Sequence, residues 1–267
     1  MCQLRLMSPY VAKSSGEFTQ AIALRSQRST RLVCFIRKSN QNHVTFSNQD
    51  ALDTGVETTS INTQTTDHLG LLDAALGYIE QRHWDVALGT EVLRQDGVWS
   101  CSCGEAGCAA IGAHPLHQDW QKKISGQPSK AHEWWSAHPR SSIILPTGRV
   151  FDVLDVSEEA GCLALARLER SEANIGPVAA TPTRRMYFFV LPHAKDKLAK
   201  VLPGLGWGKS ALDLVCRSTG DYVVAPPSRM GIRGQAQWVR PPADTNRWLP
   251  DIEELLAPLS YACGLHR

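Results

Sequence analysis

The chain has 267 residues, 43% of them hydrophobic, and a formal net charge of +2. This length accommodates one sizeable domain with a core, or one domain with an appendage, and no run approaches the roughly 20 apolar residues of a membrane-spanning helix. So small a net charge excludes a bulk basic surface, although a local basic groove that binds nucleic acid is compatible with it.

Residues 1–66 differ in composition from the rest of the chain. They carry seven Lys and Arg against four Asp and Glu, and seventeen of the twenty-eight positions from Ser39 to Thr66 are Ser, Thr, Asn or Gln. A segment this polar cannot bury enough apolar surface to order itself, and basic residues interrupt each apolar stretch that could form a secretion signal. We therefore predict a flexible N-terminal segment over residues 1–66 and a folded domain over residues 67–267.

The folded part is expected to begin with a helix at Asp67. Its apolar face is predicted from helical three-and-four spacing of Leu69, Leu72, Leu76 and Ile79. A strand is expected over His83–Leu88, followed by a hairpin over Val92–Trp99. Asp96-Gly97 fits the type I′ turn that closes such a hairpin.

The segment from Trp99 to Trp120 combines metal-ligating side chains with glycines that allow tight turns: Cys101, Cys103, Cys108, His114 and His117. Three thiolates and one imidazole make a common tetrahedral zinc set, so we predict structural Zn²⁺ bound by Cys101, Cys103, Cys108 and His114. His117 could replace His114 as the fourth ligand. The other cysteines are scattered, which is typical of the reducing cytoplasm, where we expect the protein to reside.

After this segment, apolar runs alternate with turns. A helix is expected from Pro128 to about His138, with one of Trp134 and Trp135 in the core and the other at its rim rather than in a base-stacking platform. The run Ser141–Val156 predicts two strands broken by Pro146-Thr147-Gly148. The elements expected next are a helix over 158–171, a strand over 185–191, a helix over 195–201, two strands over 211–225, an edge strand over 237–239 and a helix over 249–259. Because strands and helices mix without regular alternation, the pattern indicates an α+β fold.

The order of the motifs resembles the bifunctional DNA primase/polymerase family, the archaeo-eukaryotic primase-like module of plasmids, phages and bacteria, especially in its short actinobacterial form. The resemblance covers roughly Leu69 to Gly264. It rests on five segments in chain order: CSCG…C…AHP, WW…HPRSSIILPTG, FDVLDV, TPTRRMYFFV and ALDLVCRSTGDYVVAPPS.

The resemblance implies a two-layer α+β fold with an RNA-recognition-like sheet and a zinc-bearing insertion. It also implies template-directed nucleotidyl transfer to a 3′-hydroxyl in DNA replication or repair, with a single-stranded DNA template and nucleoside triphosphates as partners. That chemistry uses two divalent ions, here Mg²⁺ or Mn²⁺, held by carboxylates about 3.5–4 Å apart.

The family's site residues match this chain only in part. Asp155 matches the first catalytic acid and Asp213 the third, but Ser157 stands at the position of the second. Met186 stands where the family has a histidine that contacts the triphosphate. Nearby residues that could hold a triphosphate or a nucleic-acid backbone are Thr183, Arg184, Arg185 and Arg217. The alternative for these four is a solvated charged edge.

Three functions are compatible with this pattern. The first is an active primase/polymerase that recruits a further acid from Glu158 or Glu159. The second is a catalytically inactive relative that binds nucleotide or single-stranded nucleic acid as a regulatory or assembly module. The third is a structural zinc protein without a nucleic-acid role. Because the helicase half that often accompanies such modules is not in the sequence, we expect a replication role to need a helicase partner in trans.

Overall fold

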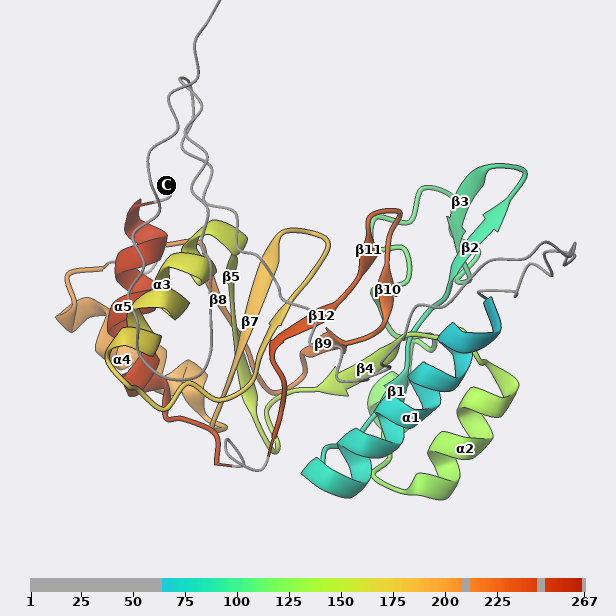
Figure 1. Cartoon of the computed structure of the whole chain (residues 1–267), viewed down its shortest axis with the longest axis horizontal. Helices are drawn as coiled ribbons and strands as arrows, with labels where there is room; N and C mark the ends of the chain where they lie inside the picture. The colour runs from blue at the N-terminus through green and yellow to red at the C-terminus, as the bar shows by residue number, and fades with distance from the viewer. Residues whose placement is uncertain (1–63, 208–211, 244–247, 266–267) are drawn as a thin grey trace, which may run out of the picture. The chain divides into compact units, whose positions relative to one another are not determined.

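Apolar strands of the chain build a five-stranded antiparallel sheet that forms the centre of the fold. The computed structural model describes residues 64–207, 212–243 and 248–265 (Figure 1). The strand order of this sheet is β12 (Gln237–Arg240), β6 (Val178–Ala180), β7 (Arg185–Val190), β5 (Asp152–Ser157) and β8 (Leu214–Arg217). Strand β5 lies between β7 and β8, and all of its residues except Ser157 are buried.

One face of the five-stranded sheet is covered by three helices, α3 (Glu158–Arg170), α4 (Ala194–Gly204) and α5 (Ile252–Leu265) (Figure 1). Side chains two residues apart on a strand share a face, so Leu154 and Val156 of β5 both enter this core. Residues at the odd positions of β5, among them Val153 and Asp155, point to the opposite face.

A second sheet contains β1 (Ala87–Leu88), β4 (Ile143–Pro146) and β9 (Tyr222–Ala225), in that order. Helices α1 (Gln64–Arg82) and α2 (Pro128–Ala137) lie beside it in Figure 1. Their buried side chains join those of β4, β9 and the second face of the large sheet in one core, which includes Trp84, Trp135 and Phe189. Trp135 is buried and Trp134 is only partly buried, which confirms the prediction for this pair.

Two hairpins and one 3₁₀ turn complete the described fold. The predicted hairpin is confirmed as β2 (Val92–Gln95) paired with β3 (Val98–Cys101), and Asp96 and Gly97 both have the positive φ of a type I′ turn. The second hairpin, β10 (Arg229–Met230) with β11 (Gly234–Gln235), was not expected, nor were β6 and the 3₁₀ turn η1 (Trp120–Lys122). Each of these is two or three residues long. Such elements carry little sequence periodicity.

Most of the predicted N-terminal segment, residues 1–63, lies outside the described residues, as does Ala211. Helix α1 starts at Gln64, three residues earlier than expected, and the strand expected over His83–Leu88 is limited to Ala87–Leu88. The last helix starts at Ile252 rather than at Leu249, and Pro250 lies in the connecting segment, where its carbonyl accepts a hydrogen bond from the Leu191 N–H. No helix of the described residues is long and apolar enough to cross a membrane.

The two sheets are connected by two turns that touch each other. Strands β4 and β5 flank Pro146-Thr147-Gly148 but belong to different sheets, and so do β8 and β9 around Thr219-Gly220-Asp221. The Thr147 hydroxyl donates to the Ser218 carbonyl at 2.7 Å, and the Thr147 N–H donates to the Asp221 carbonyl at 3.1 Å. At Gly148, an added Cβ would overlap backbone atoms of Thr219.

We expect Gly148→Ala to destabilise the protein more than Gly220→Ala. Both glycines have positive φ, +95° and +91°, so alanine at either position costs about 1–2 kcal/mol of backbone energy. Only at Gly148 does the new methyl group also meet backbone, which adds about 1–3 kcal/mol. Denaturant unfolding of the two variants measures the difference. Equal losses of stability would contradict the close contact between the turns.

Candidate active site and metal centre

Asp155 lies at the centre of a cluster of charged side chains on the face of the large sheet opposite α3. It is in the middle of β5, directly opposite Tyr187 of β7 and Val215 of β8, and is only 2% exposed. Arg185 and Arg217 lie two residues along β7 and β8 from these partners, so they project from the same face as Asp155.

Both oxygens of the Asp155 carboxylate accept hydrogen bonds from arginine. Arg185 donates from Nε to Oδ1 at 2.7 Å. Arg217 donates to Oδ2 from Nη2 at 2.8 Å and from Nε at 3.1 Å. A carboxylate this deeply buried would otherwise be costly, and charge-assisted bonds to two guanidinium groups compensate for its lost hydration.

Arg185 also joins Asp155 to Asp213, which precedes β8 instead of lying within the strand as expected. Nη1 of Arg185 donates to Oδ2 of Asp213 at 2.6 Å. Burial alone lowers the pKa of Arg185, but hydrogen bonds to Asp213 and Asp155 outweigh this and raise it. Burial, reinforced by the negative charge of Asp155, raises the pKa of Tyr187 to about 12. Arg185 therefore stays charged and Tyr187 stays neutral at physiological pH.

The second cluster is formed by sulfur and nitrogen ligands in the loop that follows β3. The ligand atoms of Cys101, Cys103, Cys108 and His114 all lie within 4.8 Å of one another. Nε2 of His114 is 3.4 Å from Sγ of Cys101 and 3.5 Å from Sγ of Cys108. These separations suit ligands of one tetrahedral ion, whose bonds are about 2.0–2.3 Å long. The four donors can hold a metal ion.

Neighbouring groups interact with two of the four donors, His114 and Cys101. Nδ1 of His114 is 2.9 Å from the Pro115 carbonyl, an acceptor that places the proton on Nδ1 and leaves Nε2 free to bind a metal. Burial opposes ionisation of Cys101, but hydrogen bonds from Thr90 and from the N–H groups of Cys103 and Gly112 lower its pKa to about 6. His117 is not in the cluster and lines a separate cavity.

The family model described as "Bifunctional DNA primase/polymerase, N-terminal" matches residues 75–248. The chain belongs to this Prim-Pol family. Among solved structures, it is similar to the polymerase domain from Mycobacterium tuberculosis Ligase D in complex with DNA, with 10% identity and a TM-score of 0.31 over 73% of this chain and 87% of that one. At this TM-score, residues of the two structures cannot be equated. No curated protein matches the sequence.

Two residues that the sequence comparison led us to expect at positions of the family's site have structural roles here. Ser157, expected at the position of the second acid, caps α3, because its hydroxyl accepts a hydrogen bond from the Ala160 N–H at 3.4 Å. Met186, expected at the position of the histidine, points away from Asp155 and into the core under α3, with its sulfur 3.8 Å from Sγ of Cys162. No side chain at position 186 of this strand can face the acids, whereas Arg185 does.

The four residues expected to bind phosphate separate into two pairs. Arg185 and Arg217 contact Asp155. Arg184 pairs with Glu158 and Glu159 of α3, and the Thr183 hydroxyl is 2.9 Å from that of Thr181 in the same turn. Glu158 and Glu159, the acids considered as replacements at the site, are therefore ion-paired with Arg184.

Asp152 lies on the opposite face of β5, as its odd separation from Asp155 predicts. Its carboxylate accepts hydrogen bonds from the Ala194 N–H at 2.8 Å and from the Ser218 hydroxyl at 3.0 Å, and thus fixes the start of α4. Burial raises its pKa. This acid supports the fold and does not contribute to the Asp155 cluster.

We expect Arg185→Ala to destabilise the Prim-Pol domain by about 1–3 kcal/mol, because buried Asp155 loses one of its two cations. Arg184→Ala is the matched control. Its side chain is 57% exposed and pairs at the surface, so its loss should cost less than about 1 kcal/mol. Denaturant unfolding compares the two variants. Similar stability losses would show that Arg185 does not compensate for the burial of Asp155.

Proposed function

We propose that this Prim-Pol domain binds nucleotide or single-stranded nucleic acid through its arginine cluster, and that its metal-dependent nucleotidyl transfer is weak or lost. The observation that carries this proposal is the bridge formed by Arg185 between Asp155 and Asp213. The family assigns nucleotidyl transfer to the fold, and the bridge places a cationic side chain between the acids that would hold the catalytic ions.

Two-metal catalysis requires several carboxylate oxygens free to ligate Mg²⁺ or Mn²⁺. Asp155 has both oxygens engaged by guanidinium groups, and Asp213 shares Arg185 with it. Among the described residues, the Cys101–His114 set alone brings three or more possible metal ligands together, so no third acid joins Asp155 and Asp213. A divalent ion at these acids would first have to displace Arg185.

The same cluster is suited to phosphate. Guanidinium groups bind phosphate oxygens in a two-pronged geometry, and the side chains of Arg185 and Arg217 are 25% and 40% exposed. The Asp213 side chain is 52% exposed. A phosphate of a nucleotide or of a strand backbone can therefore replace it as the acceptor for the outer N–H groups of Arg185. A single-stranded DNA template and nucleoside triphosphates are the proposed partners, with a helicase supplied in trans for a role in replication.

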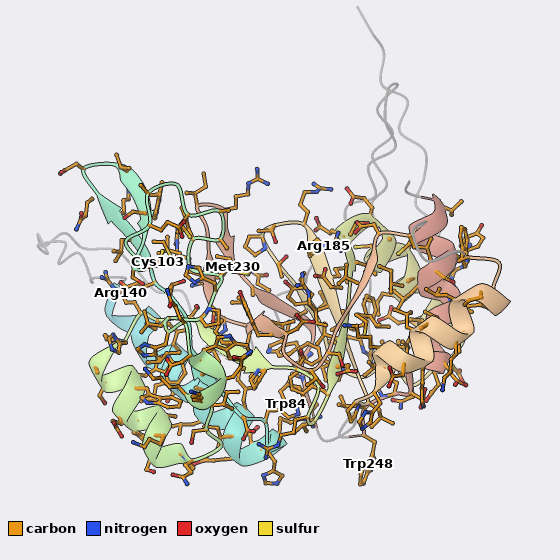
Figure 2. The ribbon with its side chains drawn as sticks, turned by 180° about the vertical axis from the view of Figure 1, so that it is seen from behind. Trp84, Cys103, Arg140, Arg185, Met230 and Trp248 are labelled. Atoms are coloured by element: carbon orange, nitrogen blue, oxygen red, sulfur yellow. The ribbon has the colours of Figure 1, made fainter. Side chains whose placement is uncertain are left out.

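We propose further that the Cys₃His set holds structural Zn²⁺. The metal would fix the loop between Cys101 and His114, and this loop contacts the β10–β11 hairpin. The Gly231 N–H donates to the Ile111 carbonyl at 2.7 Å, and the two segments lie side by side in Figure 2. In terms of the family fold, this loop would be the zinc-bearing insertion, and the five-stranded sheet would be the RNA-recognition-like layer.

We expect His114→Ala and Cys108→Ser to lose bound zinc and to unfold at lower temperature, because a three-ligand set holds the ion less tightly. His117→Ala should retain one zinc per chain, since its imidazole is outside the ligand set. Elemental analysis and thermal unfolding measure both effects. Zinc retention by His114→Ala together with loss in His117→Ala would assign the fourth ligand to His117 instead.

Primer extension on a short single-stranded template, with magnesium or manganese, tests the catalytic part of the proposal. We expect no incorporation above the level of Asp155→Ala and Asp213→Ala, whereas fluorescence polarisation should detect binding of labelled single-stranded DNA that weakens in Arg217→Ala. Incorporation by the native protein that disappears in both aspartate variants would establish a working polymerase and overturn the proposed loss of activity. Absence of DNA and nucleotide binding in a folded, zinc-loaded sample would overturn the binding role.

A further inference from the structure

A cavity of about 200 Å³ lies between η1, α2 and β1, away from the Asp155 cluster. Its polar and aromatic lining includes His117, Trp120, Lys123, Trp134 and His138. It therefore brings together the histidine left over from the metal cluster and the rim tryptophan of the Trp134-Trp135 pair. None of these side chains has a part in the function proposed above.

The ring nitrogens in this lining are available to a ligand. Among the described residues, none forms a hydrogen bond with the indole N–H of Trp120 or Trp134, or with the imidazole of His117 or His138. None of these nitrogens is a buried atom that lacks a hydrogen-bond partner, so each of them reaches the cavity or solvent. By contrast, Trp135 donates its indole N–H to the Ser141 carbonyl at 3.0 Å.

The cavity lining contains one cation and one acid, each in an exposed ion pair. Glu133 is paired with Lys130 at 2.7 Å, and Lys123 is 3.4 Å from Asp119. All four side chains are about half exposed, so both pairs are weak and readily exchanged. The lining thus offers Lys123 to an anionic group, and two imidazoles next to two indoles to an aromatic ring.

The size of the cavity limits the ligand to one ring system. Pockets for drug-sized molecules measure about 300–1,000 Å³, so 200 Å³ accepts a planar ring but not a complete nucleoside triphosphate. Indole faces bind nucleobases by stacking, whatever the sequence. From this lining and volume we infer that the cavity binds a single nucleobase, with its attached phosphate near Lys123 and His138.

One side chain of the cavity lining also contacts β9, the strand that follows Arg217 in the chain. Trp120 contacts Tyr222 of β9 edge-to-face, with ring centroids 5.4 Å apart. Tyr222 follows the turn that begins after Arg217. A base held against Trp120 therefore lies one aromatic contact away from β9, which belongs to the second sheet and follows β8, the strand of Arg217, across the Thr219-Gly220-Asp221 turn. The ligand is either a free mononucleotide or one base of a single strand.

Titration of the zinc-loaded protein without magnesium tests the inference, with three probes: AMP, an eight-nucleotide single-stranded DNA, and an abasic DNA strand of the same length. We expect saturable binding of AMP or of the base-containing strand, and weaker binding of the abasic strand. Trp134→Ala should weaken binding about five- to 150-fold, the usual effect of removing one stacking partner. His138→Ala should weaken it without affecting folding, because the His138 side chain is exposed and forms no hydrogen bond, ion pair or ring contact with the other described residues.

The controls are Trp248→Ala, an 82% exposed tryptophan elsewhere, and His132→Ala, an exposed histidine of α2 outside the cavity. Both should bind as the native protein does. AMP binding that depends on Trp134 and His138 identifies a mononucleotide site, and the same dependence for the strand alone identifies a strand site. No saturable binding, equal binding of the abasic strand, or unchanged binding in both cavity variants overturns the inference. Binding of the abasic strand that is lost in Arg217→Ala reports the arginine cluster, so the two proposals can fail separately.

Discussion

The burial of Asp155 at the centre of the large sheet is the constraint that organises this site. A carboxylate that is 2% exposed needs positive partners, and the antiparallel pairing of β5 with β7 and β8 supplies Arg185 and Arg217 on the same face. Arg185 also contacts Asp213, and thereby connects the two aspartates that we expected from the family resemblance. The same ion pairs compensate for the burial of Asp155 and underlie the proposal that the two aspartates do not form a free metal site.

The positions at which the chain departs from the Prim-Pol pattern have local structural roles. Ser157 caps helix α3. Met186 packs directly against Gly161, where an added Cβ would come within 2.6 Å of the methionine sulfur. The acids of the first turn of α3 pair with Arg184 instead of approaching Asp155. The region around Asp155 thus contains a helix cap, a packed core residue and an ion-paired turn.

Outside this site, the fold depends on contacts between short segments that are distant in sequence. The turn at Gly148 meets the turn at Thr219, and the loop with the four possible metal ligands contacts the β10–β11 hairpin through Gly231. Each sheet depends on the other because β4 continues into β5, and β8 into β9, across these turns. The cavity lined by Trp120 and Trp134 lies between η1, α2 and β1, where such segments meet.

The sequence by itself determined the local elements. Helical spacing located α1, Asp96-Gly97 located the first hairpin, and the density of Cys and His located the loop with the four possible metal ligands, because each signal is contained within a few neighbouring residues. The alternation of β5 also placed Asp152 and Asp155 on opposite faces. Only the tertiary structure decided that β4 and β5 enter different sheets, that His117 leaves the metal cluster for a cavity, and that Arg185 bridges two aspartates 58 positions apart in the chain. Strand pairing and ion pairing join residues that are remote in sequence, and no local pattern specifies which partners will meet.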